Sequence, residues 1–181
     1  MNYFEIILLA GVLITASIID IRVRKIPNWL TFSTVTAAMT HHLLASGIKG
    51  LILSLSGLAL GMSVFIIIYL LGGMGAGDVK LMGAVGAMLG PEGAVYALFC
   101  TVLVGGIYAA VIFALNRQYL KDVLSQWSTS LKLYIRTGHI FRPLATDGRL
   151  NGPVLHYGLA IAIGTFLSIA LAASNCQLLR I

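Results

Sequence analysis

Carboxyl groups are scarce in this 181-residue sequence, which contains only six Asp and Glu residues. Two of them, Asp20 at the end of one apolar segment and Asp78 at the start of another, are candidates for chemistry. Two carboxyl groups held within about 3 Å of each other cannot both ionise easily, so one keeps its proton while the other acts as a base. Such a pair can activate a water molecule and protonate a peptide carbonyl.

Apolar residues dominate the elements that must position these aspartates. Hydrophobic residues make up 59% of the sequence and charged residues only 10%, whereas a soluble domain has ~45–50% apolar and ~25% charged residues. This composition excludes an ordinary water-soluble fold. Because a membrane-spanning helix needs roughly 20 apolar residues, we expect an all-α polytopic membrane protein in which residues 1–181 form a single membrane-embedded domain.

Apolar segments separated by turns predict about six transmembrane helices. Ten of the 12 Lys and Arg residues fall on one side of the resulting topology, and the positive-inside rule makes that side cytoplasmic. The basic residues therefore indicate orientation in the lipid of a bacterial or archaeal inner (cytoplasmic) membrane rather than nucleic-acid binding. The predicted segments are residues 3–19, 29–45, 51–71, 79–89, a fifth that ends near residue 115, and 153–173.

The alternating topology places Asp20 and Asp78 at the same depth, on the cytoplasmic side, although they are far apart in the sequence. Carboxylates within a membrane are costly and usually functional. Either aspartate alone would more often be an interfacial charge at a helix end, but their matched depth favours a pair. The other four acidic residues are most simply solvated charges: Glu5, Glu92, Asp122 and Asp147.

A polar and basic segment, residues 116–150, separates the last two apolar segments. Its apolar residues recur at three-and-four spacing, which predicts an amphipathic helix on the cytoplasmic surface of the bilayer. Lipid anchoring is the common role of such a helix, and gating of substrate access is the alternative. The apolar positions are Leu120, Val123, Leu124, Trp127, Leu131, Tyr134 and Ile135.

The histidine and cysteine residues form no recognisable metal-binding motif in the sequence. His41 and His42 are adjacent, so on a helix they point roughly 100° apart and make a poor pair of metal ligands. Cys100 and Cys176 belong to no CxxC pair. We therefore expect neither a metal nor an organic cofactor.

Each aspartate lies beside a distinctive turn. After Asp20, Pro27 disfavours helix at the residue before it and suits the first turn of a new helix, which Asn28 can cap. Before Asp78, Gly75 and Gly77 lack side chains, so the backbone could approach an extended peptide and admit water beside the carboxylate. A plain flexible connection is the alternative role of this glycine-rich segment.

The two turns carry a family resemblance. Residues 20–28 (DIRVRKIPN) together with residues 75–81 (GAGDVKL) resemble the type IV prepilin peptidases, which are membrane aspartic proteases with a GxGD motif. The resemblance implies that Asp20 and Asp78 are the catalytic dyad of an aspartic endopeptidase. It also implies a substrate, the leader peptide of prepilins or pseudopilins, cut at the cytoplasmic membrane face. The candidate substrate-binding residues are Gly75, Gly77, Lys80, Pro27 and Asn28.

Lys80 lies two positions after Asp78 and thus on a different helix face. Such lysines most often anchor a helix at lipid phosphates, and tuning of the site's field is the alternative. The chain lacks the region with two CxxC pairs found in the longer, bifunctional enzymes of the family, so we expect no methyltransferase activity. The short form resembles the monofunctional peptidases of tight-adherence (Flp, Tad) pilus systems.

Two other functions use the same aspartates. A proton-coupled transporter would employ them as a relay, but it would need polar groups that continue across the bilayer. The segments at residues 3–19 and 79–89 offer almost none outward of the aspartates. A noncatalytic assembly subunit would merely pair them with lysines.

Overall fold

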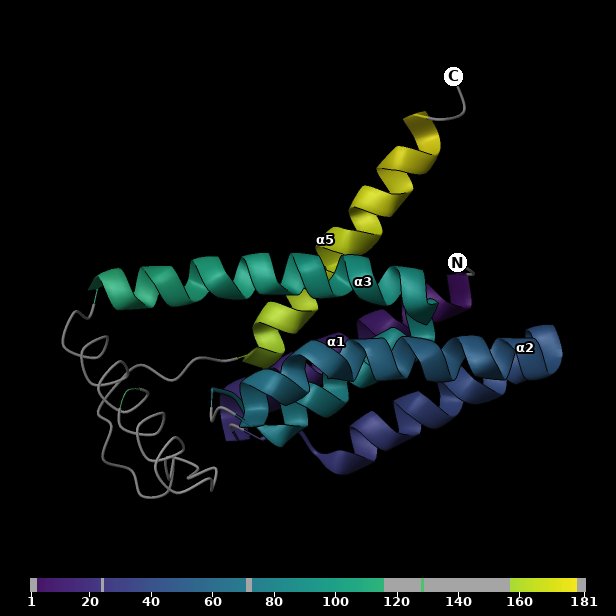
Figure 1. Cartoon of the computed structure of the whole chain (residues 1–181), viewed down its shortest axis with the longest axis horizontal. Helices are drawn as coiled ribbons and strands as arrows, with labels where there is room; N and C mark the ends of the chain where they lie inside the picture. Colours follow the sequence, from purple (N-terminus) through teal and green to yellow (C-terminus); the bar gives the residue numbers. More distant parts are fainter. Residues whose placement is uncertain (1–2, 24, 71–72, 116–127, 129–156, 179–181) are drawn as a thin grey trace.

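The computed structural model describes residues 3–23, 25–70, 73–115, 128 and 157–178. The described residues are helical or lie in short connections, and they include no strand. The expected all-α fold is therefore confirmed over the described residues, and the predicted surface helix within residues 116–150 falls almost entirely outside them. The helices that these residues form are α1 (Tyr3–Val23), α2 (Asn28–Leu70), α3 (Ala76–Leu115) and α5 (Tyr157–Leu178) (Figure 1).

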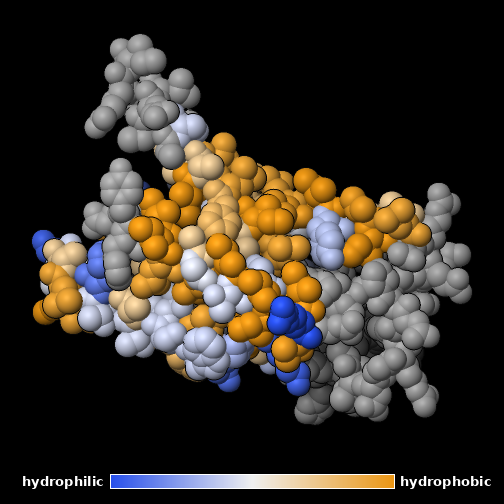
Figure 2. Space-filling model, turned by 180° about the vertical axis from the view of Figure 1, so that it is seen from behind, coloured by the Kyte–Doolittle hydropathy of each residue, from blue (hydrophilic) through white to orange (hydrophobic). Residues whose placement is uncertain are grey.

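Three of the helices are long and apolar enough to cross a membrane, over Glu5–Val23, Asn28–Leu70 and Ala76–Ile112. The fourth, α5, contains a shorter apolar segment, Tyr157–Ala172. Large apolar side chains also face outward, as the 62% exposure of Ile67 and the 65% exposure of Phe99 illustrate. Figure 2 shows hydrophobic residues over a broad continuous area of the surface. An apolar exterior of this extent indicates an integral membrane protein.

Both α2 and α3 are interrupted by a glycine in the left-handed region. Gly47 has φ 62° and Gly90 has φ 71°, a conformation that glycine adopts without steric cost. Pro91 follows Gly90 and suits the first turn of a new helical segment because its missing N–H needs no partner there. In Figure 1 each helix folds back at its break, so that α2 and α3 each form two arms. The turns expected near residues 46–50 and 90–93 are therefore present.

Glycines let α2 and α3 pack closely. A Cβ on Gly57 or on Gly86 would contact the carbonyl oxygen of the other glycine, and a Cβ on Gly61 would contact the Met82 carbonyl. Ser54 Oγ donates a hydrogen bond of 2.9 Å to the Ala87 carbonyl oxygen in the same contact. The GxxxG spacing of these glycines thus reflects close helix packing.

The first arm of α3 is the centre of the molecule. Its side chains from Leu81 to Met88 are buried, and they belong to the same core as Leu9 and Leu13 of α1. Because this arm lies inside the protein, the short apolar segment at residues 79–89 need not face lipid. Asp78 stands at the start of this central arm, so the packing of the core fixes its position.

Candidate active site

Asp20 lies in the last turn of α1 and is only 8% exposed. Its Oδ2 accepts a hydrogen bond of 3.1 Å from the Gly158 backbone N–H, in the first turn of α5. The first N–H groups of a helix have no partner within the helix and suit an anionic acceptor. A Cβ on Gly158 would lie 2.9 Å from that Oδ2 atom and 3.1 Å from Asp20 Cβ. Only glycine therefore lets the start of α5 approach Asp20 this closely.

Asp78 is the third residue of α3 and is 9% exposed. Its Oδ2 accepts a hydrogen bond of 3.1 Å from the Gly75 backbone N–H, which precedes the helix. An acidic residue at the third helical position commonly reaches back in this way to cap the helix. The bond fixes one oxygen of the carboxylate, Oδ2.

The two carboxylates act on each other electrostatically. They come from different helices, and Figure 1 shows that the end of α1 and the starts of α2, α3 and α5 lie at the same end of the molecule. Within the described part of the chain, neither carboxylate forms an ion pair with Lys or Arg. The arrangement therefore provides two buried, interacting carboxyl groups whose hydrogen-bond partners are backbone amides.

The two turns expected from the sequence contact each other. A Cβ on Gly77 would lie 3.0 Å from Ile26 Cβ and 3.4 Å from the Ile26 backbone nitrogen and oxygen. The next residue, Pro27, accepts a hydrogen bond of 3.2 Å from the Leu30 N–H in the first turn of α2. The absence of a side chain at Gly77 thus lets the connection between α1 and α2 pack against the start of α3.

Lys80 and Asn28 form a separate contact beside the carboxylates. Lys80 Nζ donates a hydrogen bond of 2.8 Å to Asn28 Oδ1 and lies 5.4 Å from the centre of the Phe32 ring. This position over the ring permits a cation–π interaction. The candidate residues therefore form two separate hydrogen bonds. Gly75 donates one to Asp78, and Lys80 of α3 donates the other to Asn28 of α2.

Sequence reasoning missed Gly158, whose amide holds Asp20. The signal was nevertheless available, because the segment expected at residues 153–173 begins on the same side of the membrane as Asp20. A small residue at the start of that segment was a candidate neighbour by depth alone. Its role depends on the packing of α5 against α1, which no local pattern reports.

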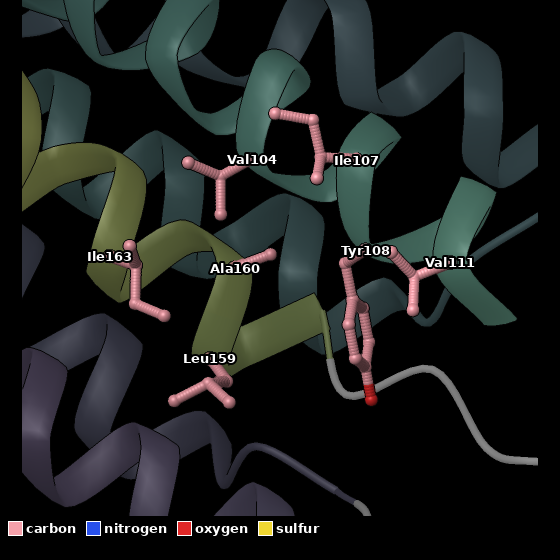
Figure 3. Close-up of a pocket in the computed structure, with 7 residues that line it drawn as sticks. All are labelled: Val104, Ile107, Tyr108, Val111, Leu159, Ala160 and Ile163. Atoms are coloured by element: carbon pink, nitrogen blue, oxygen red, sulfur yellow. The ribbon is translucent and has the colours of Figure 1, made fainter.

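An apolar pocket of about 290 Å³ lies between the second arm of α3 and the start of α5 (Figure 3). One of its lining residues, Leu159, directly follows Gly158, whose amide bonds Asp20. Its lining is apolar apart from the Tyr108 hydroxyl group and suits an apolar side chain or acyl chain. The lining residues are Val104, Ile107, Tyr108, Val111, Leu159, Ala160 and Ile163.

Comparison with known proteins identifies the family but no individual relative. The model of the type IV leader peptidase family matches residues 7–110, more than half of the chain and the part that contains both aspartates. No curated protein and no solved structure matches the chain. The residues matched, together with the helical membrane fold, show that the chain belongs to the type IV leader peptidase family.

Proposed function

We propose that this protein is an aspartic endopeptidase that removes the leader peptide of a prepilin or pseudopilin at the cytoplasmic face of a bacterial or archaeal membrane. Membership of the leader peptidase family makes it a protease. The observation that supports an aspartic mechanism is the interaction of two buried carboxylates, Asp20 and Asp78, that come from different helices. The proposed substrates include pilins of the Flp type.

In the proposed mechanism, a water molecule held between the two carboxyl groups attacks the scissile peptide carbonyl. The ionised carboxylate takes a proton from the water, and the protonated one stabilises the developing oxyanion. The amides of Gly158 and Gly75 each hold one carboxylate oxygen, which leaves the second oxygen of each group for water and substrate. Since a coupled pair titrates as a unit, the acid and base roles belong to the pair.

The proposed membrane arrangement has six crossings. The two arms of α2 and of α3 would each cross once, as would α1 and α5, and residues 116–150 would lie on the cytoplasmic surface. Arg22, Lys25 and Lys80 belong to the same end of the helices as the aspartates, in keeping with the positive-inside rule. Both termini would then lie outside.

Substrate contacts are proposed for the residues that surround the two carboxylates. An extended leader peptide could approach the backbone where Gly75 and Gly77 carry no side chain. The Lys80–Asn28 contact and Pro27 would border this approach. The transporter alternative is not supported, because the family is one of peptidases.

Co-expression with a candidate prepilin tests this function. Mass spectrometry of the prepilin should show a single cut just before its hydrophobic helix and no added methyl group. A prepilin that stays intact with the wild-type enzyme, across a panel that includes Flp-type pilins, would contradict the proposal. A proton-driven flux in vesicles without any cleavage would favour the transporter instead.

A further inference from the structure

A second group of titratable side chains lies at the other end of α1. Glu5 is in the first turn of α1, about four turns from Asp20, and it is only 7% exposed. The expectation that Glu5 is a solvated charge is therefore wrong. Glu5, His41 and His42 each offer one ligand atom, and these three atoms lie within 4.8 Å of one another. The packing of α1 against the first arm of α2 thus brings Glu5 to two adjacent histidines that lie far from it in the sequence.

The distance between Glu5 and His41 suits a shared metal ion. Glu5 Oε1 lies 3.4 Å from His41 Nδ1, which is longer than a charge-assisted hydrogen bond of about 2.7–2.9 Å. Two ligands on a tetrahedral Zn²⁺ ion, each about 2.0–2.1 Å from the metal, lie about 3.4 Å apart. A metal ion between the two atoms would therefore require little movement of this pair.

His42 is held in the manner of a metal ligand. Its Nε2 lies 3.0 Å from the Met88 carbonyl oxygen, and because a carbonyl only accepts hydrogen bonds, Nε2 carries the proton and donates. In a neutral imidazole Nδ1 then bears the lone pair that a metal ion can accept. Metal-binding histidines usually donate their other ring N–H to a carbonyl or carboxylate, which fixes the ring. The bond also links this cluster to the central arm of α3.

The rings of His41 and His42 lie edge to face, with centres 5.6 Å apart and planes at 76°. Adjacency on a helix argued against this pair as a two-residue site, but Glu5 supplies a third ligand from another helix. The cluster lies near the surface, because the His41 side chain is 21% exposed although its Nδ1 atom is buried. An ion could therefore reach it, and a water molecule could complete a four-coordinate shell.

We propose that Glu5, His41 and His42 form a binding site for a divalent transition metal ion of the Zn²⁺ type. Two imidazoles and one carboxylate are a donor set that Zn²⁺ and Co²⁺ accept readily. The ion would join α1 to the first arm of α2 near the turn at Gly47, far from Asp20. This proposal is based on the geometry of the cluster alone and does not depend on whether the protein cleaves prepilins.

Titration of the purified full-length protein in detergent tests the site. After treatment with a chelator, the protein is titrated with Co²⁺, whose visible absorption is strong in tetrahedral sites. We expect one Co²⁺ per chain, displaced by Zn²⁺. The variants Glu5→Gln, His41→Ala and His42→Ala should each weaken binding at least about tenfold, the lower end of what even indirect partners of a metal contribute.

Two control variants match these changes in kind. Glu92→Gln neutralises an exposed carboxylate, and His139→Ala removes a histidine outside the described residues; both should bind Co²⁺ like the wild type. Because a cluster variant could lose binding by failing to fold, the melting temperature of the wild type is measured as well, and Zn²⁺ should raise it. Wild-type protein that binds no Co²⁺ or gains no stability from Zn²⁺, or cluster variants that bind as tightly as the wild type, would overturn the site.

Discussion

Helix α1 carries a buried carboxylate near each end, and the two differ in their partners. Asp20 accepts a hydrogen bond from a backbone amide and interacts electrostatically with a second carboxylate, Asp78. Glu5 instead lies beside the imidazole of His41. Like charges oppose each other's ionisation and retain a proton between them, whereas imidazoles can share a cation with a carboxylate. We therefore propose that similarly buried carboxylates serve proton chemistry at one end of α1 and metal binding at the other.

The largest difference between the two ends of α1 is expected when Asp20 or Asp78 is changed to asparagine. Asp20→Asn and Asp78→Asn each remove a group that must gain or lose a proton, so cleavage of a prepilin should fall at least about 1000-fold. Glu5→Gln, at the other end of α1, should cleave at the wild-type rate. Gel assays of prepilin processing, with membrane insertion of each variant checked by fractionation, measure this. Wild-type cleavage by either asparagine variant would remove the dyad.

A methyl group at Gly158 should lower prepilin cleavage, which depends on Asp20, and leave Co²⁺ binding at the other end of α1 unchanged. Because a Cβ there would lie 2.9 Å from Asp20 Oδ2, Gly158→Ala must displace either α5 or the carboxylate. A displacement of about 1 Å at a reacting group costs about 100-fold in rate, and we expect a loss of that order in kcat.

The matched control is Gly106→Ala, because a Cβ on Gly106 meets no atom within 4 Å. Cleavage rates for both variants, together with Co²⁺ binding, provide the readout. Unchanged cleavage by Gly158→Ala would show that the amide of residue 158 does not position Asp20. Weakened Co²⁺ binding in this variant would show that the two ends are coupled.

The glycine contact between α2 and α3 supports both ends and should affect stability more than chemistry. Gly57→Ala or Gly86→Ala would press a methyl group against backbone atoms, and overpacking of this kind costs about 1–3 kcal/mol. Gly11→Ala, which meets nothing within 4 Å, should be neutral or slightly stabilising because alanine favours helix. Thermal unfolding in detergent measures the difference, and equal melting temperatures for the three variants would contradict the close packing.

The smallest effect is expected at Lys80, which lies beside the carboxylates without bonding them. Lys80→Met removes the bond to Asn28 and the contact with Phe32, so stability should fall by no more than about 1 kcal/mol. If the residue borders the substrate, KM should rise severalfold while kcat stays unchanged. Lys49→Met, an exposed lysine beside the Gly47 turn, is the control. A large fall in kcat would assign Lys80 a direct catalytic part.

Local signals explain what the sequence could predict. The breaks at Gly47 and Gly90 were expected because short segments with turn residues, 46–50 and 90–93, separate apolar segments there. The shared location of Asp20 and Asp78 was expected because membrane topology fixes depth. The amide of Gly158 and the burial of Glu5 beside His41 could not be predicted in this way. Both depend on how α1 packs against α5 and α2, and a hydropathy pattern gives the depth of a residue but not its lateral neighbours.

The most direct test of the paired carboxylates is a double-mutant comparison of prepilin cleavage rates for Asp20→Asn, Asp78→Asn and the two changes combined. Groups that act as a unit are strongly non-additive. The combined variant should therefore cleave as slowly as either single variant, and no more slowly. Losses that multiply in the combined variant, or a single variant that keeps most of its activity, would show that Asp20 and Asp78 act separately and would contradict a shared catalytic site.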